Sequence, residues 1–308
     1  MLDCEFHAAR KGKANVRSLP AIIVCFVAVA CGPSPSSDAP SIPADATTVA
    51  PAEPASADVV GDDELEVDTP TGSDVLVDLL EQDIPYGEGP DGNLVGFLAV
   101  PADAAEPLPG VIVLHEWWGL TPEIRDATRR IARAGYLALA IDLYGGRTAD
   151  DVAGAQALLR ELVGAPDLVR DNIRQAYEYV DRYTFAPRIG AVGWDLGGRW
   201  ALQAALMYPQ DLDAVAVIYG TVELDEELLS TLRMPVLGIF GENDESIPIA
   251  DVREFRATLI RLGTGGEVRI YSGAQHGFFF PSSDNYAPLL ADDVWTRLLR
   301  HLAAALQQ

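Results

Sequence analysis

Cysteine is nearly absent from this chain. Only three of its 308 residues are cysteines, at Cys4, Cys25 and Cys31, and none lies beyond Gly32. A disulfide needs two cysteines, a thiolate metal site needs several, and a thiol hydrolase needs one as its nucleophile. The sequence after Gly32 therefore excludes all three.

Positive charge is also scarce. The sequence has 22 Lys and Arg against 46 Asp and Glu, which gives a formal net charge of −24. Proteins that bind nucleic acids neutralise phosphates with an excess of Lys and Arg, so we expect no nucleic-acid partner. At 49% hydrophobic residues the chain is too apolar to be disordered throughout, and its length fits one large α/β domain or two small ones.

The first 31 residues have the pattern of an export signal. Four basic residues up to Arg17 precede a short apolar run, residues 19–30, which is too short to span a bilayer comfortably. Residues 28–31 resemble a bacterial lipobox, in which Cys31 is lipidated and becomes the mature N-terminus. We therefore expect an exported protein of the periplasm or cell envelope, anchored to a membrane through Cys31. A cleaved signal peptide without lipid and an uncleaved anchor are the alternatives.

Residues 32–74 read as a linker, because they are rich in Pro, Ala, Ser, Thr and Asp and poor in large apolar residues. Residues 75–308 then alternate predicted strands and helices. This order predicts an α/β domain with a mostly parallel twisted sheet and helices on both faces. The expected strands are 77–86, 94–100, 110–115, 136–141, 188–192, 214–219, 235–240 and 267–271. The expected helices are 122–134, 148–162, 166–183, 196–207, 248–262 and 291–306.

Three loops that follow predicted strands carry candidate catalytic groups. Residues 193–198 read Gly-Trp-Asp-Leu-Gly-Gly, and their small residues permit a sharp strand-to-helix turn that presents Asp195. Asp244 follows a later strand, and His276 follows the last one. Of the four histidines, only His276 lies in such a loop. The chain order of elbow, acid and histidine is that of α/β-hydrolases.

The chain also resembles the dienelactone hydrolase family of the α/β-hydrolase superfamily. The resemblance covers most of residues 75–306. It is carried by Leu-His-Glu-Trp-Trp-Gly-Leu at 114–120, Ile-Arg-Asp at 124–126, Arg-Ala-Gly-Tyr at 133–136, Asp-Leu-Tyr-Gly at 142–145, the elbow, Asp244, His-Gly-Phe at 276–278, Tyr286 and Trp295. It implies an α/β-hydrolase fold without a large cap, no metal or organic cofactor, and a small, often carboxylated ester or lactone as the substrate.

The resemblance also implies roles for individual residues. Glu116 corresponds to the family glutamate that controls the nucleophile, and the backbone N–H groups of Trp117 and Leu196 correspond to the oxyanion hole. Arg147 lies where a substrate carboxylate could bind. We further expect the aromatic residues Trp117, Trp118, Trp194, Phe278 and Phe279 to cluster around the site, with Trp118, Trp194 and Phe278 as substrate-binding candidates. The alternative is ordinary core packing, which we expect for at least half of the set.

The chain departs from the family at the nucleophile, where Asp195 replaces the usual cysteine or serine. Three interpretations follow. In the first, Asp195 acts as a carboxylate nucleophile, as in dehalogenases and epoxide hydrolases, whose elbows the sequence also resembles. In the second, Asp195 acts as a general base on water. In the third, the domain binds a ligand without turnover. Common dehalogenases carry a large helical cap after the sixth strand. Here only about fifteen residues, 220–234, join that strand to the next.

Overall fold

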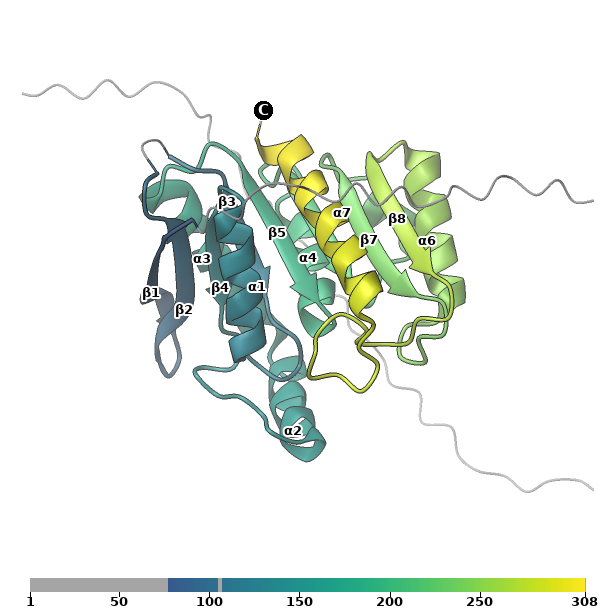
Figure 1. The fold of residues 1–308 in the computed structure, drawn as a ribbon, viewed down its shortest axis with the longest axis horizontal. Helices are drawn as coiled ribbons and strands as arrows, with labels where there is room; N and C mark the ends of the chain where they lie inside the picture. The colour runs from purple at the N-terminus through teal and green to yellow at the C-terminus, as the bar shows by residue number, and fades with distance from the viewer. Residues whose placement is uncertain (1–76, 105–106, 308) are drawn as a thin grey trace, which may run out of the picture. The chain divides into compact units, whose positions relative to one another are not determined.

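The computed structural model describes residues 77–104 and 107–307. The predicted signal, the linker and Cys31 lie outside these ranges. Eight strands form one sheet in the order β1-β2-β4-β3-β5-β6-β7-β8 (Figure 1). The first two strands form an antiparallel hairpin, β2 pairs antiparallel with β4, and all later pairings are parallel. The strands are β1 (Leu79–Gly89), β2 (Gly92–Pro101), β3 (Gly110–Leu114), β4 (Leu137–Ile141), β5 (Ile189–Trp194), β6 (Ala214–Ile218), β7 (Val236–Gly241) and β8 (Gly266–Tyr271).

Helices cover both faces of the sheet, as the strand sequences require, because the central strands are buried on both sides. Ile112 and Leu114 of β3 belong to one core, whereas Val111 and Val113 belong to the other. The first core receives side chains of α2 (Val152–Val163), α3 (Pro166–Tyr183), α4 (Leu196–Met207) and α6 (Ile249–Leu262). The second receives α1 (Pro122–Arg133) and α7 (Pro288–Leu306), which lie in front of the sheet in Figure 1. The predicted fold class is thereby confirmed.

Several element boundaries differ from the predicted ones for local reasons. Strand β1 continues to Gly89, beyond the predicted end at residue 86, and β2 begins at Gly92, two residues before the predicted start. Helix α2 begins at Val152, because the Asp151 carboxylate caps it by accepting from the Gly154 N–H at 2.7 Å. Helix α7 begins three residues earlier than expected, with Pro288 in its first turn.

The connection between β6 and β7 contains only the four-residue helix α5 (Glu226–Leu229). All residues of this connection are described, and none of them forms a helical cap. The carboxyl edge of the sheet is therefore left without a cap domain at this point, as the short connection predicted.

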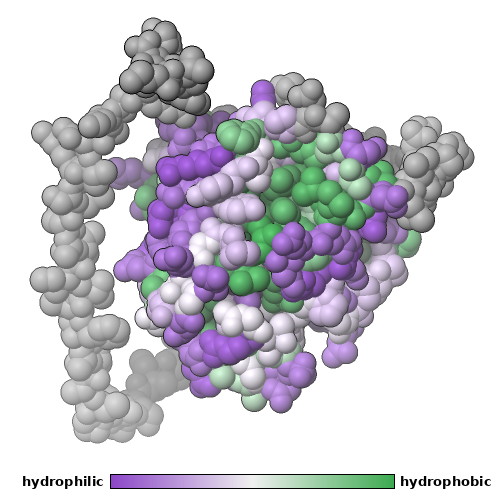
Figure 2. All heavy atoms as spheres, turned by 90° about the vertical axis from the view of Figure 1, so that its left-hand side faces the viewer, coloured by the Kyte–Doolittle hydropathy of each residue, from purple (hydrophilic) through white to green (hydrophobic). Residues whose placement is uncertain are grey.

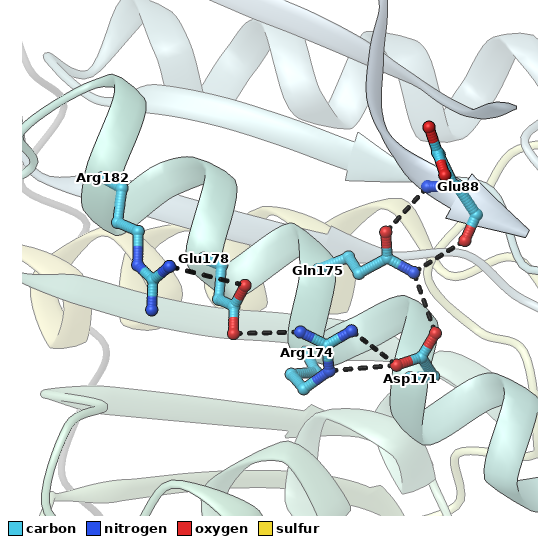
Figure 3. A network of polar contacts seen from close by, with 6 residues as sticks. All are labelled: Glu88, Asp171, Arg174, Gln175, Glu178 and Arg182. Atoms are coloured by element: carbon cyan, nitrogen blue, oxygen red, sulfur yellow. Dashed lines mark hydrogen bonds and ion pairs between the residues drawn. The ribbon is translucent and has the colours of Figure 1, made fainter.

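The hairpin is fastened to α3 by side chains that reach the backbone. Gln175 accepts from the Glu88 N–H at 2.7 Å and donates to the Glu88 carbonyl at 2.8 Å (Figure 3). The Tyr86 hydroxyl donates to Asn172 at 2.6 Å, and the Asn172 amide donates to the Asp142 carbonyl at 2.9 Å. These bonds connect the hairpin, α3 and the loop after β4, and so fix the position of that loop at the carboxyl edge.

The sheet ends at β1, whose outer edge has no neighbouring strand in the described part of the chain. Figure 2 shows this side of the domain, where a hydrophobic area is bordered by hydrophilic residues. Two acidic residues of β1 pair with α1, since Arg125 donates to Asp83 at 2.6 Å and Arg129 to Glu81 at 3.0 Å. Charged side chains on an edge strand disfavour pairing with another chain. Among the described helices, none is both long and apolar enough to cross a membrane.

Candidate active site

Asp195 sits on a strained turn between β5 and α4. Its backbone has φ 51° and ψ −116°, a conformation that non-glycine residues rarely adopt. The turn closes only because its neighbours are glycines: a Cβ on Gly193 would overlap the Gly197 carbonyl, and one on Gly197 would overlap the Leu114 carbonyl. The small residues that marked this segment in the sequence therefore make the sharp turn possible.

The structure brings Asp195, His276 and Asp244 together in one chain of contacts. Asp195 Oδ1 lies 3.3 Å from His276 Nε2, and Asp244 Oδ2 lies 2.8 Å from His276 Nδ1. Asp244 is buried, and its other oxygen accepts from the N–H groups of Ser246 and Ile247 at 2.8 and 3.0 Å. About a quarter of the Asp195 and His276 side chains is exposed, 25% and 27% respectively. Asp244 therefore fixes the Nδ1 side of the imidazole, while part of the ring remains exposed to solvent.

Glu116 lies beside this group and is held by a residue that the sequence analysis missed. The Tyr219 hydroxyl donates to Glu116 Oε1 at 2.9 Å, and the Tyr219 ring meets the His276 ring edge-on with centroids 5.1 Å apart. Tyr219 directly follows β6 and has a positive φ of 37°. Its place after a parallel strand, at the edge where Asp195 and His276 also lie, was the signal that could have identified it.

The predicted oxyanion donors also lie at the elbow. The Trp117 N–H points to Asp195 Oδ2 across a long contact of 3.4 Å. Leu196 is the first residue of α4, where backbone N–H groups have no acceptor within the helix. The Trp117 amide therefore already faces negative charge at the elbow, and the Leu196 amide is not used within the helix.

His115 positions the Glu116–Trp117 segment. The ring is fully buried and accepts the Leu143 N–H at Nε2, 3.0 Å away, so its Nδ1 carries the proton and donates to the Glu116 carbonyl at 2.6 Å. Burial lowers the pKa of His115, which keeps the ring neutral. This histidine is a structural bridge between the loops after β3 and β4.

The protonation of the site is unusual. Burial alone lowers the pKa of His276, but the hydrogen bonds and charges of Asp195 and Asp244 outweigh it and raise the pKa to about 10. Burial and the nearby Asp195 charge raise the pKa of Glu116 to about 8. At neutral pH the site therefore holds an imidazolium between two carboxylates, with a protonated Glu116 beside them.

The residues predicted to bind substrate are dispersed. Trp118 is partly exposed and its ring lies 4.8 Å from that of Trp117. Trp194 is fully buried and packs against Phe279, Phe280 and Trp295. Phe278 is also fully buried, between the rings of Tyr219 and Tyr271. The structure thus places Trp194 and Phe278 in the core beneath the site, not at a surface that a substrate could reach.

Arg147 is engaged within the protein. Its guanidinium donates to Glu161 of α2 at 2.7 Å and to the Tyr144 carbonyl at 3.0 Å, and its side chain is 54% exposed. Within residues 77–104 and 107–307, no group of three or more His, Cys, Asp or Glu side chains has an arrangement that could hold a metal ion.

Comparison with known proteins assigns the chain to a family. The model of the Dienelactone hydrolase family matches residues 94–306. A protein of Aquifex aeolicus named "Putative carboxymethylenebutenolidase" is 31% identical over 207 residues, which cover 65% of this chain and 88% of that protein. A protein of the same name from Escherichia coli K12 is 34% identical over 221 residues, covering 67% and 81%.

The fold agrees with these matches. The crystal structure called "Putative Dienelactone Hydrolase" from Klebsiella pneumoniae superposes with a TM-score of 0.65 at 29% identity, covering 73% of this chain and 99% of that one. The family match spans more than half of the chain and contains Asp195, Asp244, His276 and Glu116. The chain therefore belongs to the dienelactone hydrolase family, whose members are hydrolases that act on esters.

Proposed function

We propose that this protein hydrolyses small esters or lactones with the Asp195 carboxylate as its nucleophile. The observation that carries the proposal is the 3.3 Å contact between Asp195 and a His276 that Asp244 holds in place. A serine or cysteine must lose a proton before it attacks, and the histidine of a triad takes that proton. A carboxylate has none to lose, so His276 can begin the cycle as the imidazolium that its raised pKa predicts.

The first half-reaction uses His276 as an acid. An oxygen of Asp195 bonds to the carbonyl carbon of the ester, and negative charge develops on the carbonyl oxygen, near the N–H groups of Trp117 and Leu196. The tetrahedral intermediate then collapses with cleavage of the carbon–oxygen bond to the alcohol. The departing alkoxide takes the proton from His276 Nε2 and leaves as the alcohol. The acyl group remains bound to Asp195 as a mixed anhydride.

The second half-reaction uses the same histidine as a base. Acylation removes the charge of Asp195, which helps to hold the pKa of His276 high, so the imidazole now favours the neutral state. It takes a proton from water while the hydroxide oxygen bonds to the acyl carbon. The bond to Asp195 breaks, the acid product leaves, and the carboxylate and the imidazolium are restored.

Attack at an sp³ carbon is the competing chemistry for an aspartate at this position, and it would make the protein a dehalogenase or an epoxide hydrolase. The four-residue α5 after β6 argues for the ester, because common dehalogenases insert a cap there. A protein that binds its ligand without turnover is the remaining alternative. Asp195 acting as a base on water would give the same ester products without a covalent adduct.

We also propose that the protein is exported and tethered through lipid on Cys31. The proposal is supported by the basic residues, the apolar run 19–30 and the lipobox-like residues 28–31. Labelling of the expressed chain with a fatty-acid analogue, compared with Cys31→Ser, tests it. Equal labelling of the two chains would refute lipidation at this residue.

The catalytic proposal is tested with the full chain on p-nitrophenyl acetate and a dienelactone. Turnover should disappear in His276→Ala and Asp195→Asn, and rapid quenching should leave an acyl mass on the peptide that contains Asp195. Turnover without that adduct would favour the base role. Halide release from a haloacid would favour dehalogenation. Binding without turnover, with esterase activity gained by Asp195→Cys, would show a binding protein.

A further inference from the structure

Strand β8 forms the second free edge of the sheet. It lies at the opposite end of the strand order from β1, and in the part of the chain that the structure describes no strand pairs with its outer side (Figure 1). The carbonyls of Gly265 and Tyr271 accept from backbone N–H groups of β7 and of the residue after it, at 2.8 and 2.9 Å. Backbone groups alternate in direction along a strand, so Val268 and Ile270 present their N–H and C=O groups outward.

A hollow of about 320 Å³ lies along this edge, between β8 and the second half of α6. Val268 and Ile270 line it from the strand, and they are partly buried against the first core. Leu259 and Ile260 line it from the helix, and Ile260 is 69% exposed. A strand placed beside β8 would direct side chains of the same face into this hollow, and so remove apolar groups from water.

The other face of β8 carries side chains of both charges. Glu267 and Arg269 are exposed, and they stand on either side of Val268. Glu267 accepts from Arg297 of α7 at 2.6 Å, so this face is the one that α7 covers. Charges on an edge strand usually disfavour pairing with another chain. An acid and a base two residues apart, however, complement each other when the strand pairs with a copy of itself.

Antiparallel pairing centred on Val268 meets both requirements. Val268 then lies opposite Val268 of the second copy, and Ile270 lies opposite Gly266, so that outward backbone groups meet outward backbone groups. Glu267 lies opposite Arg269 in the pairs without backbone bonds, where side chains approach most closely. A register centred on Glu267 or on Arg269 would instead place like charges opposite each other. The charges therefore select one register, and its two-fold symmetry forms the Glu267–Arg269 contact twice.

The free edge of β1 lacks this complementarity. Its sequence contains three acidic residues and no Lys or Arg, so pairing with a copy of itself gains no ion pair between the strands. Glu81 and Asp83 are already paired with arginines of α1. Pro85 has no N–H to donate across the edge. Of the two edges, β8 is therefore the one suited to a second copy of the chain.

We propose that this protein forms a symmetric dimer in which β8 pairs antiparallel with β8 of a second copy, in the register centred on Val268. The two sheets then continue into each other, and apolar side chains of the second copy enter the hollow beside α6. Asp195, Asp244 and His276 do not line this hollow. The inference therefore does not depend on the reaction proposed above.

Sedimentation equilibrium over about 1 to 100 μM tests the association. The parent chain is the full chain carrying Cys4→Ser, Cys25→Ser and Cys31→Ser, so that neither a lipid nor a native thiol contributes. It should be a dimer at the upper end of this range, and a monomer there would overturn the proposal. Arg182→Glu makes a charge reversal on α3, far along the chain from β8, and should leave the dimer Kd unchanged.

Charge reversal in β8 tests the contact between the copies. Glu267→Arg and Arg269→Glu each turn two attractive pairs into two like-charge pairs, and each should weaken the dimer at least about tenfold. Mixing the two variants places two bases opposite two acids, so the mixture should regain the affinity of the parent chain. A folding defect would not be repaired by mixing. Unchanged Kd values in the single variants, or a mixture that stays monomeric, would overturn the pairing.

Disulfide formation tests the register. In the proposed dimer the two Val268 Cα atoms form a hydrogen-bonded antiparallel pair about 5.5 Å apart, within the range that a disulfide bridges. Val268→Cys in the parent chain should therefore give a covalent dimer on mild oxidation. The two Ile270 Cα atoms are offset by four residues, about 13 Å, so Ile270→Cys should not crosslink. Equal crosslinking of the two variants, or crosslinking of Ile270→Cys alone, would overturn this register.

Discussion

Replacing Asp195 by asparagine should lower the pKa of His276 substantially. The two carboxylates that flank the imidazole, at 3.3 and 2.8 Å, raise this pKa from 6.5 to about 10 against the opposing effect of burial. An opposite charge at such a distance typically shifts a pKa by about 1 to 3. Removing one of the two carboxylates, and keeping Asp244, should therefore bring the pKa of His276 down to between about 7 and 9.

The assay is an NMR titration of the imidazole signals. Only four histidines are present, and the signal of His276 is identified by its loss in His276→Ala. The variant has nearly the same shape as wild type but lacks the charge, so it also imitates the acylated state of Asp195. Glu116→Gln serves as a control, because the groups that raise the pKa of His276 are its direct partners Asp195 and Asp244, so replacing Glu116 should move that pKa much less. An unchanged titration in Asp195→Asn would refute the reasoning that acylation converts His276 into a base.

Further predictions follow from the same geometry. The fold favours the protonated forms of Glu116 and His276, because it raises the pKa of both groups. The contribution of Glu116 to stability should therefore decline from about pH 4.5 to 8, and that of His276 from about pH 6.5 to 10. Denaturant unfolding should show stability that falls as the pH rises, and the fall below pH 8 should be less steep in Glu116→Gln. Tyr219→Phe removes a hydrogen bond that lowers the pKa of Glu116, so that pKa should rise further; an acidic shift in the carboxyl titration, followed by infrared spectroscopy, would contradict this. Gly197→Ala should destabilise the domain by about 1 to 3 kcal/mol, because the new Cβ overlaps the Leu114 carbonyl. An unchanged denaturation midpoint would show that the elbow can relax.

The parts of the site that come from loops after predicted strands could be anticipated from the sequence. Parallel strands bring their carboxyl ends to one edge, so Asp195, Asp244 and His276 were expected to converge there, and they do. Tyr219 belongs to the same edge, yet a single tyrosine after a strand is not a pattern that distinguishes a functional residue from a core residue.

The orientation of individual side chains was harder to anticipate. Trp194 is adjacent to Asp195, but it is the last residue of β5, and its side chain packs with α7 and the loop before it. We expected Arg147 to be free for a substrate carboxylate. The sequence does not show that Glu161, in the helix that follows Arg147, reaches its guanidinium. Pairings between a loop and a neighbouring helix depend on tertiary packing, which the periodicity of apolar residues does not encode.

The short α5 has a consequence for the rate of turnover. Since this connection forms no cap between β6 and β7, substrate can approach Asp195 and His276 from solvent without waiting for a domain to close. The water needed in the proposed second half-reaction has the same direct access. Solvent also raises the effective dielectric around the imidazolium, which weakens the electrostatic stabilisation that a closed site would provide. In the proposed reaction, this open site favours rapid entry of substrate and release of product over the stronger electrostatic stabilisation that a closed site provides.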